Sequence, residues 1–148
     1  MLSSCLIELF ERDLNRLIAE LNLYKQEESL WEIQEGISNS AGNLCLHLVG
    51  NLNHFIGATL GHTGYVRYRD DEFNLKNIPR QDLLTNIENC ILAVKNTLEK
   101  LSATDLEKDF PLAPLGKVIS TTQMLLHLLA HLSYHLGQIN YHRRLIGG

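Results

Sequence analysis

Apolar residues recur at intervals of three and four through four long stretches of this chain. These stretches cover residues 4–23, residues 38 or 39 to 61, residues 79–101, and a last segment that opens at Ser120. Such spacing gathers the apolar side chains on one face of an α-helix. Four amphipathic helices in one chain predict an all-α fold, and specifically a four-helix bundle.

Capping residues and breakers mark where these helices begin. Ser38 or Asn39 can cap the second helix, Pro79 suits the first residue of the third, and Ser120-Thr-Thr-Gln123 has the form of a capping box. Residues 25–38 form a polar connection, which Leu30, Trp31, Ile33 and Ile37 are expected to hold against the core.

Two long loops separate the predicted helices. One follows the second helix over residues 61–78, and the other, marked by Pro111, Pro114 and Gly116, precedes the fourth helix. A loop of about 18 residues in so compact a chain is more often functional than accidental. Residues 61–78 are therefore a candidate region for function.

Length and composition favour one globular domain over residues 1–148, since 45% of these residues are hydrophobic and 20% are charged. The net charge of -4 argues against a nucleic-acid partner. No apolar run reaches the roughly 18 residues of a membrane span, and the N-terminus lacks a signal-peptide pattern. We therefore expect a cytoplasmic protein without a membrane partner.

The three cysteines, Cys5, Cys45 and Cys90, are odd in number and far apart. This arrangement argues against a disulfide framework and contains no CxxC zinc pair. Buried free thiols are the expectation, and none of the three is placed like a nucleophile.

Four of the seven histidines lie in the last predicted helix: His127, His131, His135 and His142. The first three are four residues apart, so they share one helix face with neighbouring Cβ atoms about 5–6 Å apart. A lone histidine is usually a surface or ordinary core residue. A core-facing row that also includes Gln138 is costly unless its polar groups find partners, and a metal ion would provide one.

Helix geometry limits which histidines can share an ion. His127 and His135 are two turns apart, about 12 Å along the axis, which is an awkward span for two ligands of one ion when metal–nitrogen bonds are about 2.1 Å. A ligating pair therefore includes His131, with either His127 or His135 as its partner. The second helix offers His47 or His54 as a third ligand. Three histidines leave a coordination position open, as in catalytic sites.

The segment His131-Leu-Ser-Tyr-His135-Leu-Gly137-Gln138 resembles the signature of the DinB-like metalloenzyme superfamily, an HxxxH pair followed closely by Gly-Gln on the last long helix. The segment Leu46-His47-Leu-Val-Gly-Asn51 is similar to the family's third-ligand segment. The resemblance implies a DinB-like bundle in which His47, His131 and His135 bind a divalent ion such as Zn, Ni or Fe.

Other residues near these segments become candidates for supporting roles. Asn51, His54, His127 and Gln138 can orient the ligating imidazoles or pack between helices. Gly137 can allow a neighbouring helix to approach closely. In the loop after the second helix, Arg67, Arg69, Asp70 and Glu72 can bind a polar substrate or form a solvated surface.

The resemblance also implies a function. Related proteins include thiol transferases, so we expect a metal-dependent enzyme of the thiol S-transferase or hydrolase kind, with a metal-activated thiolate or water and a small-molecule thiol substrate. One alternative is a non-catalytic, metal-binding or stress-related helical protein that acts as a dimer. Another is a helical interaction protein without a metal. DinB-like bundles often pair, so a homodimer through the apolar first helix is a further expectation.

Overall fold

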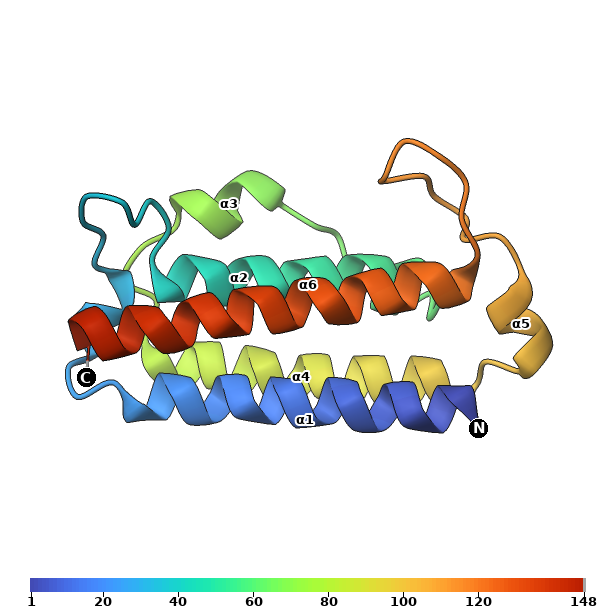
Figure 1. Cartoon of the computed structure of the whole chain (residues 1–148), viewed down its shortest axis with the longest axis horizontal. Coiled ribbons are helices and arrows are strands. Elements are labelled where there is room, and N and C mark those ends of the chain that lie inside the picture. The colour runs from blue at the N-terminus through green and yellow to red at the C-terminus, as the bar shows by residue number, and fades with distance from the viewer. Residues whose placement is uncertain (148) are drawn as a thin grey trace.

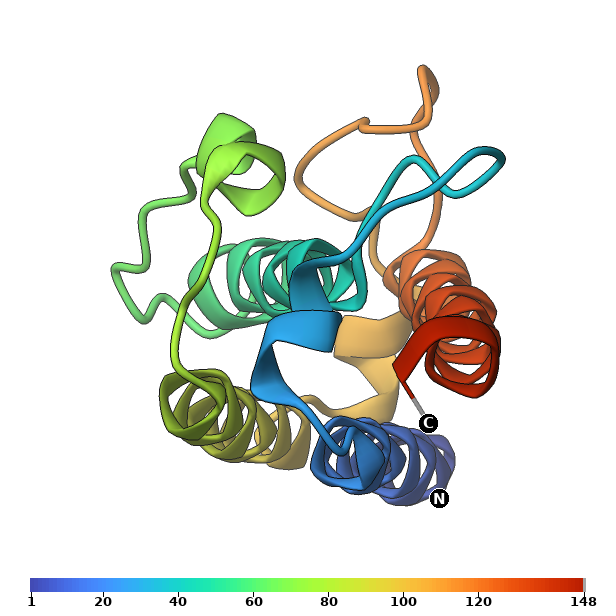
Figure 2. The same cartoon turned by 90° about the vertical axis from the view of Figure 1, so that its left-hand side faces the viewer.

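The computed structural model describes residues 1–147, and Gly148, the last residue of the predicted domain, lies outside them. Within residues 1–147 the secondary structure is helical, without strands. The four long helices are α1 (Leu2–Leu23), α2 (Ala41–Leu52), α4 (Arg80–Glu99) and α6 (Thr121–His142). They lie side by side, with α2 and α6 in one layer and α1 and α4 in the other (Figure 1, Figure 2). The prediction of a four-helix bundle is confirmed.

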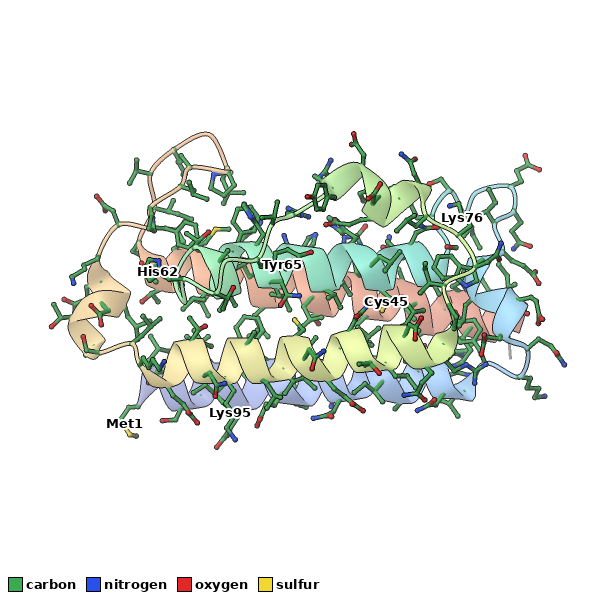
Figure 3. All side chains as sticks on the ribbon, turned by 180° about the vertical axis from the view of Figure 1, so that it is seen from behind. Met1, Cys45, His62, Tyr65, Lys76 and Lys95 are labelled. Atoms are coloured by element: carbon green, nitrogen blue, oxygen red, sulfur yellow. The ribbon has the colours of Figure 1, made fainter. Side chains whose placement is uncertain are left out.

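All four long helices contribute apolar side chains to one buried core. Examples from the four helices are Leu6, Phe10, Leu14, Leu48, Leu52, Leu83, Ile87, Leu125 and Leu132. Burial of such side chains is the main source of stability in a bundle of this kind. Cys45 lies inside the bundle between α2 and α4, whereas Lys95 and Met1 lie on the outside (Figure 3). No helix in residues 1–147 combines the length and apolar character that crossing a bilayer requires.

Shorter helical segments connect or extend the long ones. A 3-10 turn, η1 (Glu27–Trp31), follows α1, and π-helical turns extend α2 over η2 (Asn53–Ala58) and α6 over η3 (Arg143–Gly147). The helix α5 (Ala103–Glu107) begins with the capping box of Ser102 and Asp105. The η2 extension and the turn that follows it explain why the apolar pattern of the second helix continues to Gly61, past the end of α2.

The predicted loop 61–78 contains a further helix, α3 (Arg69–Asn74). Six residues are too few to show helical periodicity, so the sequence of this segment predicts a loop. This segment crosses the outer face of α2 (Figure 1). As a result α2 is covered on nearly all sides, and of its 12 residues all but Leu46 are buried.

Several local predictions were wrong in detail. Ser40, not Ser38 or Asn39, caps α2, because its Oγ is buried and accepts a hydrogen bond from the Asn43 N–H at 3.1 Å. Pro79 lies one residue before α4, as its N-cap. Ile33 is 61% exposed and holds nothing against the core, whereas Leu30 is fully buried. Cys5 is exposed, so only Cys45 and Cys90 are buried thiols.

His142 is buried at the C-terminal end of α6 and does not belong to the row of histidines. Its Nδ1 lies 2.6 Å from Tyr24 Oη, and its Nε2 lies 2.8 Å from the Glu32 carbonyl oxygen. The carbonyl can only accept, so Nε2 carries the proton and Tyr24 donates to Nδ1. His142 therefore ties the end of α6 to the segment that follows α1.

Candidate metal centre

The side chains of His47, His131 and His135 meet between α2 and α6. Each offers a ring nitrogen, and these three atoms all lie within 4.8 Å of one another. His131 Nε2 is 3.1 Å from His47 Nε2 and 3.1 Å from His135 Nε2. The structure thus brings together the three residues that the resemblance assigns as ligands. Their role as metal ligands stays a prediction.

Helix geometry accounts for this meeting. His131 and His135 are one turn apart on α6, so their side chains lie one above the other on the same face. The helix α2 runs antiparallel to α6 beside it (Figure 1). The His47 ring packs edge-on against both, with centroids 5.0 Å from His131 and 5.4 Å from His135.

In two of these rings the second nitrogen, Nδ1, forms a hydrogen bond with a side-chain oxygen. His47 Nδ1 lies 3.0 Å from Glu72 Oε1, and His135 Nδ1 lies 2.7 Å from Gln138 Oε1. Carboxylate and amide oxygens only accept, so both Nδ1 atoms carry the proton. The Nε2 atoms of His47 and His135 therefore present lone pairs toward His131.

This donor set fits a divalent cation. With bonds near 2.1 Å, a tetrahedral ion separates its ligand nitrogens by about 3.4 Å, close to the 3.1 Å observed for both pairs. His131 Nε2–H could donate to only one of its two neighbours, which leaves the other lone pair unpaired. Imidazole suits Zn, Ni and Fe. A cation between the three Nε2 atoms would satisfy them all.

The carboxylate that bonds His47 is itself paired with an arginine. Arg67 Nε lies 2.8 Å from Glu72 Oε2 and Arg67 Nη2 lies 2.9 Å from Glu72 Oε1, a two-pronged ion pair. The side chains of Arg67 and Glu72 are only 11% and 6% exposed. Burial would raise the Glu72 pKa, but hydrogen bonds from His47 and Arg67 outweigh it and the pKa is lowered.

Two residues of α2 let Glu72 reach this position. Asn43 Nδ2 donates to the carbonyl oxygens of Glu72 at 2.9 Å and Leu75 at 2.8 Å, which fastens the α3 segment onto α2. Gly50 leaves the room that the Glu72 carboxylate fills, since a Cβ at this position would collide with it. The pairing of Glu72 with His47 was missed in the sequence. A glycine inside a helix, one turn from a candidate ligand, is the signal that could have pointed to it.

The comparison with protein families matches nearly the whole chain. A model described as a protein of unknown function, DUF1572, matches residues 5–148. The chain belongs to the DUF1572 family. No curated protein matches it. Because the DUF1572 description names no activity, the function of this DUF1572 chain has to be inferred from the site itself.

Burial keeps two of the histidines of the DUF1572 chain neutral. Burial, then the neighbouring His135 and His47, lowers the pKa of His131 to about 4. Burial also lowers the pKa of His135. Neutral imidazole is the form that binds metal ions. Both rings are therefore ready to act as ligands at neutral pH.

The other candidate histidines lie beside the three and do not join them. His127 is exposed, and its ring lies nearly parallel to that of His131 with centroids 6.5 Å apart. His54 is half-buried with its ring edge-on to Phe55, and burial followed by the charge of Arg67 lowers its pKa. Spacing alone leaves both His127 and His54 open as ligands.

The remaining candidates of the DUF1572 chain have different surroundings. Arg69 and Asp70 are exposed on α3, and the Arg69 guanidinium lies 5.5 Å from the centre of the Phe73 ring. Gln138 bonds His135, as described above. Asn51 is buried on α2, and its Oδ1 has no hydrogen-bond partner among the described residues.

The prediction for Gly137 was wrong. This glycine is exposed, and a Cβ there would meet no atom of residues 1–147 within 4 Å, so no helix in that range approaches it closely. Gly50 is the glycine of the site that makes room for a neighbour. A cleft of about 340 Å³ lies behind Glu72, lined by residues such as Asn53, Tyr65 and Asn86. The three histidines of the DUF1572 chain do not line it.

Proposed function

We propose that this chain is a divalent-metal-dependent enzyme of the DinB-like kind, a thiol S-transferase or hydrolase. The observation that supports it best is the meeting of three imidazole Nε2 atoms while Glu72 and Gln138 hold the opposite nitrogens of two rings. Carboxylate and amide acceptors on the free ring nitrogen are typical of metal-binding histidines. The order of the helices and the two histidine segments support the DinB-like assignment.

The residues of the chain have separate tasks in this proposal. His47, His131 and His135 hold the ion, Glu72 orients His47 and makes it more basic, and Arg67 keeps Glu72 charged. A divalent ion held by these three nitrogens would lower the pKa of a thiol or water bound to it, and so would supply a nucleophile at neutral pH.

An exposed histidine and two exposed charged residues also support a reaction at this site. His127 is exposed one turn from His131, where it can exchange protons with a substrate and with water. Arg69 and Asp70 on α3 present both signs of charge to solvent beside the site. A small polar thiol such as a charged peptide or sugar thiol would suit these groups.

Metal content tests the first part of the proposal. Protein purified without an affinity tag should contain a stoichiometric divalent metal by elemental analysis. His47→Ala and His131→Ala should lose it, because each removes one of three ligands. His127→Ala, a matched change one turn along α6, should keep it. Wild-type protein that neither contains a metal nor takes up Zn, Ni or Fe(II) on titration would contradict the proposal.

A single-turnover assay tests the second part. Metal-loaded protein is mixed with low-molecular-weight thiols and electrophiles, and product is followed over one turnover. Activity should disappear in His131→Ala. Activity that persists without bound metal would rule out the metal mechanism. Bound metal with no exchangeable water ligand would favour the alternative of a non-catalytic metal-binding protein.

A further inference from the structure

Two buried side-chain atoms on the facing helices of the site have no hydrogen-bond partner among the described residues. They are Asn51 Oδ1 on α2 and His131 Nδ1 on α6. A buried polar atom without a partner is rare and asks for an explanation. The two atoms are complementary in type, because an amide oxygen accepts and an imidazole Nδ1–H donates.

Helix geometry places Asn51 on the His131 side of His47. The His47 ring contacts the rings of both His131 and His135, so it lies between their levels on α6. Asn51 follows His47 by four residues, about 6 Å along α2 and on the same face. Because α2 and α6 are antiparallel, this step leads toward His131 and away from His135 (Figure 1).

The other two histidines already have an acceptor at Nδ1. Glu72 serves His47 and Gln138 serves His135, whereas His131 Nδ1 has no partner within residues 1–147. In the metal-free chain His131 can carry its proton on Nε2 and donate to a neighbouring histidine. Its Nδ1 is then an acceptor without a donor, and no hydrogen bond joins it to Asn51 Oδ1 in this structure. When Nε2 ligates a cation, the ring proton is carried on Nδ1 and needs an acceptor.

We propose that Asn51 is the positioning residue for His131, and that its Oδ1 accepts the His131 Nδ1–H when the three histidines hold a divalent cation. The inference rests on the proposed metal binding. It completes a set in which each ligand has its own acceptor: Glu72 for His47, Gln138 for His135 and Asn51 for His131. The acceptor fixes the ring orientation and increases the basicity of Nε2.

Zinc affinity and imidazole protonation test the proposal together. Zinc binding is measured by competition with a chromophoric chelator, and Nδ1–H protons are observed by NMR of zinc-loaded, 15N-histidine-labelled protein. Wild-type protein should show three slowly exchanging Nδ1–H protons from the ligands. Asn51→Ala should lose one of them and bind zinc about 10–100-fold more weakly. Asn51→Asp keeps an acceptor oxygen and should retain both properties.

Asn53→Ala is the matched control. Asn53 lines the cleft beside Glu72, and none of the three histidines lines that cleft. This variant should leave zinc affinity unchanged. Wild-type affinity and three protected protons in Asn51→Ala would overturn the role of Asn51 alone. A wild-type protein that binds no zinc would overturn the proposed function as well. If Asn51→Ala does not fold, two protected protons instead of three in wild-type protein would overturn the inference, and three would support it.

Discussion

Glu72 has two partners at once, and all of its carboxylate is used. One oxygen faces His47 Nδ1 and one Arg67 nitrogen, and the other faces the Arg67 Nε. The three side chains are nearly buried. A buried arginine that loses its partner charge costs about 3–5 kcal/mol, because the remaining charge is left without compensation. Glu72 therefore supports both the fold and the candidate site.

Glu72→Gln is expected to affect both properties. The amide has one acceptor oxygen and no charge, so it cannot serve His47 and Arg67 together. The free energy of unfolding in urea should fall by about 3 kcal/mol, and zinc affinity should fall about 10–100-fold. Asp71→Asn, an exposed neighbour on α3, is the control and should change neither. Equal effects of the two variants would show that the buried pair has no special role.

At the scale of elements, the close fit of α3 on α2 depends on the absence of a side chain at Gly50. The Glu72 carboxylate occupies the space where a Cβ would project. Gly137 on α6 is the opposite case, since its face is open. Replacing each glycine by alanine therefore distinguishes two effects. Only at Gly50 does the new Cβ collide with a neighbour, whereas at both positions alanine favours the helix more than glycine does.

Gly137→Ala should stabilise the chain by about 1 kcal/mol, because alanine favours the helix and meets nothing there. Gly50→Ala gains the same preference but must displace the Glu72 carboxylate, so we expect a net loss of stability and weaker zinc binding. Urea unfolding and zinc titration of both variants check this contrast. A stabilised Gly50→Ala with wild-type zinc affinity would show that Glu72 adjusts freely.

At the scale of the whole molecule, the lowered pKa of His131 makes stability depend on pH. The pKa is about 4 in the folded chain and 6.5 in the reference state. Between these values the unfolded chain binds more protons, so stability rises with pH. The contribution is fully present above pH 6.5 and is lost as the pH falls from 6.5 through 4. The lowered pKa of His135 acts in the same direction.

Metal-free protein in chelator should therefore show a falling Tm as the pH is lowered from 7.5 to about 4.5. His131→Gln has no titrating ring at this position, and its Tm should decline less over the same range. Circular dichroism melts of the two proteins at several pH values make the comparison. Parallel curves for wild type and His131→Gln would contradict this assignment.

The sequence predicted the long helices well because each repeats the same spacing over many residues. Local geometry required only that a ligating pair on α6 include His131. The family resemblance alone separated His135 from His127, and His47 from His54. The sequence missed the pairing of Glu72 with His47, since this depends on how the α3 segment docks through Asn43 and Gly50. It also misplaced the cap of α2, because which of three adjacent polar residues is buried is decided by packing.

His47 and His131 are 84 residues apart in the chain, on the two helices of one layer. They can meet only after the chain between them has folded back and α2 has docked on α6. An ion held by both residues would therefore stabilise the finished bundle more than the folding transition state. Its effect would be on lifetime: the loaded protein would unfold more slowly, while the rate at which the chain folds would change little.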